Sequence, residues 1–354
     1  MKIGIVGAGS IAFASAAWLA QAGHAVSLWS PRSDSAAALR NAPLRATGVL
    51  ETEVRVQVAD SAAALAGDAE VLLLAVPVNG HRAVMEALLP HLRDGQTVIV
   101  SSMSSLSALY LFEAARARGC DITVASFGTT VLTARRDGAS RVRIMMRRAE
   151  LGVSALPHSR TGAALALCRQ LFGEGFSAHD NTLASALTNV NPISHGPLAL
   201  FNWTRVERAE NWPQYHYMTP QIAAVIERLD AERLALARAF GLQVRTIERH
   251  FAQSFSTKAE RLADIAAELH AKRGGPPGPA DTGTRFLTED VPYGLAFSVA
   301  LGRLAGVPTP ATQTVVEAAS LIAGRNFTAE NDLLAPLKLQ GENMAGLLAR
   351  VNQP

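Results

Sequence analysis

The sequence predicts an α/β fold in which a doubly wound, mostly parallel sheet is followed by an all-helical second domain. Three observations predict it. The chain opens on a short apolar strand, a glycine-rich turn and a helix. Apolar strands and amphipathic helices then alternate through the first half, which indicates a parallel sheet with right-handed crossovers. Beyond about residue 180, apolar residues recur at helical spacing, with no convincing strand pattern.

Composition and charge limit the class of protein. The chain has 354 residues, so we expect two domains, over 1–180 and 181–354. Hydrophobic residues make up 49% and charged residues 18%, as in ordinary globular proteins. A net charge of +3, without a long run of lysine and arginine, argues against a nucleic-acid partner. Cys120 and Cys168 have no CxxC neighbour, which argues against a zinc site or a disulfide framework and fits a cytoplasmic protein.

The first residues need a separate interpretation, because an uncharged stretch follows Lys2 as far as His24. Such a stretch imitates a signal peptide or a membrane span. Three glycines at the spacing of a dinucleotide fingerprint and the polar Ser10, Ser15 and Gln21 argue against both. We therefore expect folded structure here and no membrane partner.

The opening strand, turn and helix form a dinucleotide fingerprint, which predicts a Rossmann domain. Branched apolar residues over 3–6 are typical of a buried parallel strand. In the G-x-G-x-x-A turn, the first glycine allows a tight bend, the second lets the backbone approach a pyrophosphate, and the alanine lets helix and strand pack closely. The helix, expected over 11–21, directs free N–H groups at the phosphates. A glycine turn needed only for packing is the alternative. The predicted cofactor-binding residues are Gly7, Gly9, Ser10, Ile11 and Ala12.

The residues after the second expected strand, 25–29, bear on the choice of cofactor. They are Ser30, Pro31 and Arg32. An acidic residue here would bond the adenosine ribose and repel a 2′-phosphate, but no Asp or Glu stands at the strand end. Ser30 can donate a hydrogen bond, and Arg32 can pair with a phosphate. We therefore favour NADP over NAD, with a solvated loop charge as the alternative role of Arg32.

Strands and helices continue in alternation up to Phe172. Pro77 ends the apolar strand 71–76, and loops at such carboxyl ends line the ligand crevice, so we expect Pro77 near the nicotinamide half of the cofactor. The strand-like segments 141–146 and 152–156 have no helix between them, which predicts a hairpin-like or mixed sheet edge. The other expected strands are 53–58, 97–101 and 122–126, and the other expected helices are 61–67, 82–92, 106–118 and 161–172.

The second half reads as helical. Apolar residues at helical spacing predict helices over 221–240, 259–272 and 314–323. The glycine- and proline-rich stretch 273–279 predicts a mobile loop. Residues 214–219 are aromatic and polar, which suits a substrate pocket, an interface or simple partial burial.

Two segments of this half carry residue types suited to chemistry. In the first, Asn191 and His195 are four residues apart and share a face if the segment is helical, while Pro192 and Pro197 would bend it. A single histidine, taken alone, is more often structural than catalytic. The prolines and the Asn–His pair are nevertheless unusual for a segment that serves packing only.

The second segment is Thr284–Leu295. A helix is expected to begin at Pro292, because the residue before a proline is biased to extended geometry. Asp290 then lies at or just before the helix start, where capping the helix is its simplest role. On spacing alone, Arg285 is a surface charge.

Together these motifs resemble the opine dehydrogenase family, which includes octopine and nopaline dehydrogenases. The resemblance spans almost the whole chain, and its late motif is the most specific. A departure is the serine-rich stretch 101–106, where glycines are expected near the nicotinamide. The matching stretches are Gly7-Ala-Gly-Ser-Ile-Ala12, Asn191-Pro-Ile-Ser-His195, Arg285-Phe-Leu-Thr-Glu-Asp-Val-Pro-Tyr-Gly294 and Gly306-Val-Pro-Thr-Pro310.

The resemblance implies a Rossmann domain, a helical C-terminal domain and the reductive condensation of an amino acid with a 2-oxo acid, using NADH or NADPH. It implies that His195 is the catalytic histidine, Asp290 its paired carboxylate and Arg285 a nearby arginine, and we add Asn191 as substrate-binding. Histidine can give a proton near neutrality as hydride arrives, and a carboxylate on its other nitrogen fixes the tautomer. An arginine can hold a substrate carboxylate through two parallel bonds.

Two other functions stay open from the sequence. One is a plain 2-oxo acid or 2-hydroxy acid reductase on the same two-domain plan. The other is a nucleotide-binding sensor without turnover. The expected partners are small-molecule substrates, and the apolar helices leave a homodimer open.

Overall fold

Two units of the chain, each with its own apolar core, make up the computed structural model. It describes residues 1–354 apart from the side chains of Ser33, Asp34 and Arg273. The first unit contains Met1–Ala186 and Ala349–Pro354, and the second contains Leu187–Leu348. The predicted boundaries of 1–180 and 181–354 therefore change at both ends of the second domain.

Side-chain contacts explain both changes of boundary. Ser185, in helix α6 (Thr182–Leu187), bonds through its hydroxyl to that of Ser154 in the first sheet at 2.7 Å. Arg350, near the chain end, donates two hydrogen bonds to the carboxylate of Glu113 at 2.7 and 2.8 Å. Both contacts join residues of the first unit across long stretches of sequence.

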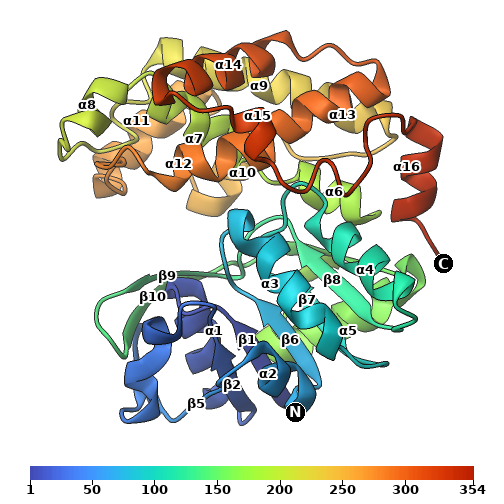
Figure 1. The fold of residues 1–354 in the computed structure, drawn as a ribbon. Coiled ribbons are helices and arrows are strands. Elements are labelled where there is room, and N and C mark those ends of the chain that lie inside the picture. The colour runs from blue at the N-terminus through green and yellow to red at the C-terminus, as the bar shows by residue number, and fades with distance from the viewer. The chain divides into compact units, whose positions relative to one another are not determined.

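The first unit is organised on an eight-stranded sheet in the order β12-β11-β8-β7-β6-β1-β2-β5. The pairs from β8 to β5 are all parallel, and β11 runs antiparallel to β8. The predicted α/β fold with a mostly parallel sheet and a mixed edge is therefore confirmed (Figure 1). Its strands are β1 (Lys2–Val6), β2 (Ala25–Trp29), β5 (Gln57–Val58), β6 (Val71–Leu74), β7 (Thr97–Val100), β8 (Thr123–Phe127), β11 (Leu151–Leu156) and β12 (Phe176–Ala178).

A second, four-stranded sheet has the order β4-β3-β10-β9 and was not predicted. The expected strand 53–58 is divided, because its first residues pair with β3 in this sheet and its last pair with β2 in the large sheet. Of the two alternatives for 141–146 and 152–156, the hairpin is excluded, since the two strands belong to different sheets. The strands are β3 (Leu44–Gly48), β4 (Thr52–Val54), β9 (Leu132–Arg136) and β10 (Arg141–Arg147).

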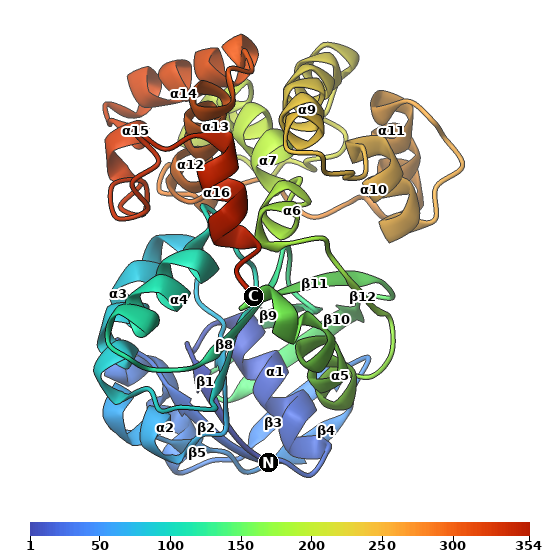
Figure 2. The same cartoon turned by 90° about the vertical axis from the view of Figure 1, so that its right-hand side faces the viewer.

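Helix α1 (Ser10–Gln21) packs against strands of both sheets. Its sequence explains this position, because it is apolar and rich in alanine around most of its circumference, as a buried helix must be. Phe13, Ala16 and Ala17 have no exposed surface. Figure 2 shows α1 beside β1 and the strands of the small sheet. The remaining helices of the unit are η1 (Ser33–Arg40), α2 (Ala62–Asp68), η2 (Val78–Gly80), α3 (His81–Leu88), η3 (Leu89–His91), α4 (Ser107–Ala117), η4 (His158–Arg160), α5 (Thr161–Phe172) and α6.

The second unit is helical, as predicted, and its only β feature among the described residues is an isolated bridge between Pro213 and Pro277. None of its helices, nor any in the rest of the described chain, has the length and apolarity needed to cross a membrane. The helices are α7 (Asn191–Leu200), α8 (Trp203–Glu207), α9 (Pro220–Ala239), α10 (Ile247–Phe255), α11 (Leu262–Arg273), α12 (Arg285–Thr288), the π-helix η5 (Val291–Ala296), α13 (Phe297–Ala305), α14 (Pro310–Ala323), α15 (Phe327–Glu330) and α16 (Met344–Val351), which enters the first unit.

The loop 273–279 has defined hydrogen bonds in the structure. Gln214 donates its backbone N–H to the carbonyl of Pro276 at 3.2 Å, and Gly278 donates to that of Trp212 at 2.7 Å. The indole of Trp212 donates to the carbonyl of Pro279 at 3.0 Å. These bonds join the stretch predicted as a mobile loop to Trp212 and Gln214, at the start of the aromatic segment, so the two stretches form one structural feature.

Candidate functional site

His195 and Asp290 form a hydrogen-bonded pair in the second unit. The imidazole Nδ1 lies 2.9 Å from Asp290 Oδ2, and the two side chains retain only 17% and 10% of their exposure. An ionised carboxylate only accepts hydrogen bonds, so Nδ1 carries the proton of this bond. The remaining ring nitrogen, Nε2, is then the atom at which His195 can exchange a proton with a substrate.

Helix α7 presents His195, and small residues let it approach η5. Pro192 occupies the first turn of α7, where its missing N–H costs no helical bond. A Cβ on Gly294 of η5 would lie only 2.2 Å from Pro192 Cγ, so only glycine allows this approach. The contact places His195 and Asp290 within reach of each other, although 95 residues separate them.

Asp290 does not cap the following helix through its side chain, so the expectation of a simple N-cap is wrong. Its backbone is already in the helical region, and its carboxylate bonds His195 instead. The helix that follows is a π-helix, a form that often marks functional sites. Asn331 donates a hydrogen bond of 2.8 Å from its amide to the carbonyl of Pro292 in this π-helix, which satisfies a backbone group there.

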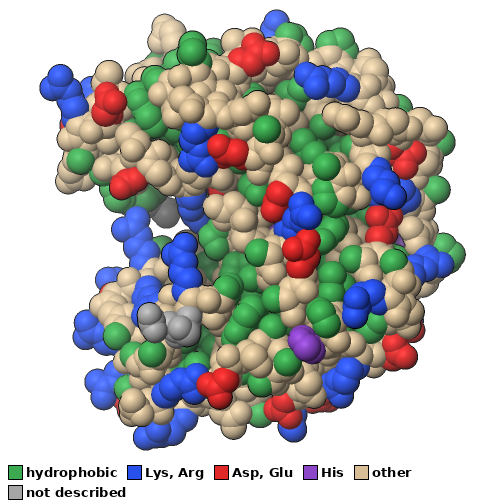
Figure 3. Space-filling view, in the orientation of Figure 1, with side chains coloured by type: hydrophobic (Ala, Val, Ile, Leu, Met, Phe, Trp, Pro, Cys, Tyr) green, Lys and Arg blue, Asp and Glu red, His purple; other side chains and the backbone are tan. Residues whose placement is uncertain are grey.

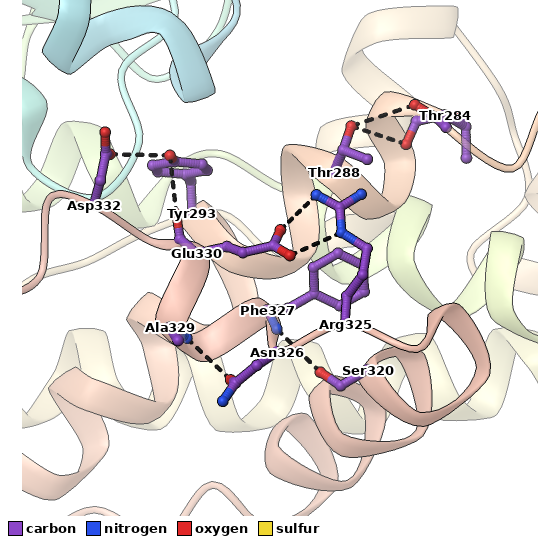
Figure 4. Close-up of polar contacts among 11 residues, drawn as sticks. Thr284, Thr288, Tyr293, Ser320, Arg325, Asn326, Phe327, Ala329, Glu330 and Asp332 are labelled. Carbon is purple, nitrogen blue, oxygen red and sulfur yellow. Dashed lines mark hydrogen bonds and ion pairs between the residues drawn. The ribbon is translucent and has the colours of Figure 1, made fainter.

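Tyr293 anchors the same π-helix to the neighbours of Asn331. Its hydroxyl lies 3.0 Å from Asp332 Oδ1 and 3.2 Å from the carbonyl of Glu330 (Figure 4). Burial, followed by the charge of Asp332, raises the pKa of Tyr293, so the phenol stays a neutral donor. Glu330 in turn forms a two-bond ion pair with Arg325, at 2.8 and 2.6 Å. The turn that carries Asp290 is therefore supported by a polar network.

Phe286 lies against His195, a contact that the sequence reasoning missed. The two rings are parallel within 2°, with centroids 3.8 Å apart. Phe286 follows directly after Arg285 and precedes Asp290 by four residues, which is the only sequence signal for a shared face. The stacked phenyl ring restricts rotation of the imidazole.

Arg285 and Asn191 lie near the His195–Asp290 pair in the sequence, but their side chains are not hydrogen-bonded to it in the described chain. Arg285 begins α12 and is exposed, and no described side chain forms an ion pair with it. Asn191 begins α7, one turn before His195, and its backbone N–H donates to the side chain of Asn189 at 3.1 Å. Neither side chain has a hydrogen bond to His195 or Asp290 in the described chain, so both heads are available to a ligand.

The glycine turn in the first unit suits a pyrophosphate. Gly7 has φ +128°, and a Cβ there would lie 2.6 Å from the carbonyl oxygen of Ala75, so the position requires glycine. A Cβ on Gly9 would meet no atom within 4 Å, so this side of the turn is open. No side chain caps the N-terminus of α1, which leaves its first N–H groups, at Ser10, Ile11 and Ala12, for a ligand.

The other predicted cofactor residues lie at the carboxyl ends of strands. Ser30 follows β2 and is half-buried, and Arg32 is exposed, without an ion-pair partner among the described side chains. Pro77 is exposed after β6, whereas the neighbouring Val78 is buried. These positions leave Ser30, Arg32 and Pro77 accessible.

The serine-rich stretch after β7 adopts the backbone that glycine would favour. Ser105 and Leu106 have φ values of 49° and 51°, in the left-handed region. Ser107 follows, and its hydroxyl lies 2.9 Å from His81 Nδ1, while His81 Nε2 lies 3.1 Å from the carbonyl of Val76. His81 therefore joins the loops after β6 and β7, a link that the sequence did not reveal.

The charge around the small sheet is mostly positive. Figure 3 shows basic side chains gathered on the first unit around β9 and β10. Of the arginines on this sheet, Arg45 and Arg141 have acidic partners, whereas Arg135 and Arg143 face solvent without a described ion pair. Among the described residues, no group of three or more His, Cys, Asp or Glu side chains could hold a metal ion.

Two family models match the chain in different parts. The model described as ketopantoate reductase PanE/ApbA matches residues 3–157. The model described as NAD/NADP octopine/nopaline dehydrogenase, alpha-helical domain, matches residues 178–323, which include both His195 and Asp290. The two matches leave residues 158–177 and 324–354 uncovered.

Characterised relatives match over most of their length. An opine dehydrogenase of Arthrobacter sp. (strain 1C) is 28% identical over 286 residues, which cover 80% of this chain and 79% of the relative. A vitopine synthase of Allorhizobium ampelinum is 25% identical over 374 residues, covering 99% of each chain.

Solved structures establish the fold independently. Octopine dehydrogenase with NADH and L-arginine superposes with a TM-score of 0.82 at 17% identity, covering 100% of this chain and 98% of the other. Yersinopine dehydrogenase with NADP+ bound has a TM-score of 0.70 at 18% identity, with the same two coverages.

Proposed function

This chain belongs to the opine dehydrogenase family, and we propose that it joins the amino group of an amino acid to a 2-oxo acid and reduces the resulting imine. It is an NAD(P)-dependent dehydrogenase acting on a CH–NH group. Pyruvate and arginine, each found with octopine dehydrogenase, are the model substrates of this proposal. The reverse reaction oxidises the product, a secondary amine with two carboxylates.

One observation carries the proposal: the 2.9 Å contact between His195 Nδ1 and Asp290 Oδ2. Reduction of an imine requires a proton on nitrogen when hydride reaches carbon. A histidine protonated on both ring nitrogens, with its Nδ1–H held by the carboxylate, can supply that proton from Nε2. The neutral ring that results can take the proton back in the reverse direction. The nicotinamide of the bound cofactor supplies or accepts the hydride.

The other residues of the second unit bind and orient in this proposal. Phe286 keeps the imidazole in one plane through the parallel contact at 3.8 Å. Arg285, exposed and without a described ion pair, holds a substrate carboxylate through two parallel bonds. Asn191, one turn before His195, donates a hydrogen bond from its side-chain amide to the other carboxylate of the substrate.

NADP is the proposed preferred cofactor. Ser30 and Arg32 follow β2 without an acidic residue at the strand end, and both are accessible, which supports contact with a 2′-phosphate. The open side of Gly9 and the uncapped start of α1 support binding of the pyrophosphate. These features are properties of the first unit alone.

The test is a spectrophotometric screen of NADPH oxidation. Pyruvate or 2-oxoglutarate is combined with a panel of amino acids and amines, and we expect oxidation that depends on both partners. His195→Ala should lower kcat by about two to four orders of magnitude, the usual share of general acid–base catalysis, and leave the Kd of NADPH nearly unchanged. The matched control is His91→Ala, which removes an exposed imidazole of η3, outside the predicted sites, and should retain activity. An unchanged rate in His195→Ala would remove its catalytic role.

A second candidate is a simple 2-oxo acid reductase, favoured by the ketopantoate reductase match over residues 3–157. It predicts NADPH oxidation with a 2-oxo acid alone, unaffected by any added amine. The same screen therefore separates the two functions. A sensor would instead bind NADPH without oxidising it with any pair of substrates, and His195→Ala would leave that binding unchanged.

A further inference from the structure

Arg136, the last residue of β9, makes an unusual number of contacts for a side chain outside both predicted sites. Its Nη1 donates to the carbonyl of Ala8 at 2.8 Å and to that of Ser35 at 2.9 Å. Its Nε and Nη2 donate to the carbonyls of Gly138 and Ala139, both at 2.9 Å. The guanidinium of Arg136 therefore donates four hydrogen bonds.

The surroundings of Arg136 fix its orientation further. Its backbone N–H donates to the hydroxyl of Ser10 at 2.9 Å, and its guanidinium carbon lies 4.3 Å from the centroid of the Phe13 ring. Phe13 is fully buried in α1, so the aromatic surface beneath the guanidinium does not move freely. The side chain is therefore held by stacking as well as by hydrogen bonds.

Three of these acceptors belong to the two loops that the proposed cofactor needs. Ala8 stands between the two glycines of the turn, and Ser10 is the first residue of α1. Ser35 lies in η1, the segment that directly follows Ser30 and Arg32. One side chain from the small sheet therefore connects the pyrophosphate loop with the loop that faces the adenosine ribose.

The bond to the Ala8 carbonyl also orients a hydrogen-bond donor, the backbone N–H of Gly9. The carbonyl of Ala8 and the N–H of Gly9 belong to one planar trans peptide, so they point in opposite directions. Holding the carbonyl on Arg136 directs the Gly9 N–H away from it. That N–H has no hydrogen bond within the described chain and is available to a phosphate oxygen.

We propose that Arg136 is a positioning residue for the dinucleotide, and that the four-stranded sheet is part of the cofactor site through it. The inference rests on the proposed use of a nicotinamide dinucleotide. The planar guanidinium can reach four carbonyl oxygens at once, which the single nitrogen of lysine cannot. Both loops are then already arranged before the cofactor binds, which lowers the entropy lost on binding.

The alternative is that Arg136 serves only to fold its own hairpin, through Gly138 and Ala139. Two variants separate the roles. Arg136→Lys keeps the charge and loses the fork, and Arg136→Met loses both. The matched control is Arg141→Met, because Arg141 lies in the same hairpin and its side chain is 62% exposed. Within the described chain, the polar contacts of its guanidinium are with Asp137.

The experiment measures Kd values of the full-length proteins for ADP-ribose, NADH and NADPH by calorimetry, together with their melting temperatures. We expect Arg136→Lys to raise the Kd values of all three ligands by about tenfold or more, and by similar factors. The reason is that the two loops joined by Arg136 contact the pyrophosphate and the adenosine, which all three ligands share. The kcat at saturating NADPH should stay within about threefold of wild type, since the reacting groups are untouched. Arg141→Met should bind like wild type.

The outcomes distinguish this inference from the proposed function. If wild type binds none of the three ligands, the proposed cofactor is wrong. If wild type binds and folded Arg136→Lys binds equally well, only the positioning role is overturned, and Arg136 serves the hairpin alone. If Arg136→Met does not fold, Arg136→Lys decides the question.

Discussion

Acidification should destabilise the first unit through His81. This imidazole is 1% exposed, with Nδ1 against the hydroxyl of Ser107 and Nε2 against the carbonyl of Val76. Burial lowers the pKa of His81 from 6.5 to about 4, although the bond to Val76 raises it in part. At neutral pH the ring is therefore uncharged in the folded protein.

The change in the free energy of unfolding with pH follows from the different pKa values of His81 in the folded and unfolded chain. Between pH 6.5 and 4 the unfolded chain binds this proton and the folded one does not, so the free energy of unfolding falls as pH falls. Above pH 6.5 the group has no effect, and below pH 4 its effect is constant. At about 1.4 kcal/mol per pKa unit, the full loss is about 3 kcal/mol. From about pH 7.5 to about pH 5 the loss is about 2 kcal/mol.

Urea unfolding followed by circular dichroism at these two pH values measures the effect. His81→Gln removes the titrating ring, so this variant should lose about 2 kcal/mol less than wild type over the same pH step. The control is His91→Gln, an exposed histidine of η3, which should show the wild-type loss. Equal losses in wild type and His81→Gln would refute the reasoning.

Two further substitutions test the proposed sites. Arg32→Ala should weaken NADPH by roughly tenfold or more and NADH by much less, because only NADPH has the 2′-phosphate; equal weakening of both cofactors in a fluorescence titration would contradict that contact. Phe286→Leu should lower kcat/KM by about 2–10-fold, the range expected for loss of a stacked aromatic pair, while Phe286→Tyr keeps the ring and should retain most of the activity. Steady-state rates that do not distinguish these two variants would show that the ring contact with His195 has no catalytic effect.

Local features were predictable because they depend on neighbours in the sequence. The helix expected over 161–172 is α5, and the strand expected over 25–29 is β2. Gly7 was predicted to be required in the turn, and its positive φ and close approach to Ala75 are consistent with that. Periodicity and glycine spacing were sufficient for these elements.

Strand pairing was less predictable, because a strand's partner can lie far away in the sequence. Residues 53–58 alternate as one strand should, yet their two ends join different sheets. The strand β3 pairs in parallel with β10, about a hundred residues later, and its own sequence gave too weak a signal to be expected. Arg136 was overlooked for the same reason, since its acceptors Ala8 and Ser35 are 128 and 101 residues away.

The fold class, the glycine turn and the residue types suited to chemistry could be predicted, since each is encoded in short stretches of chain. The role of Asp290 depends instead on how distant segments pack. Capping the next helix and bonding His195 were both compatible with its position in the motif. The contact of Gly294 with Pro192 brings α7 against the π-helix and makes the imidazole the partner, because a carboxylate bonds the donor that the packing places within reach.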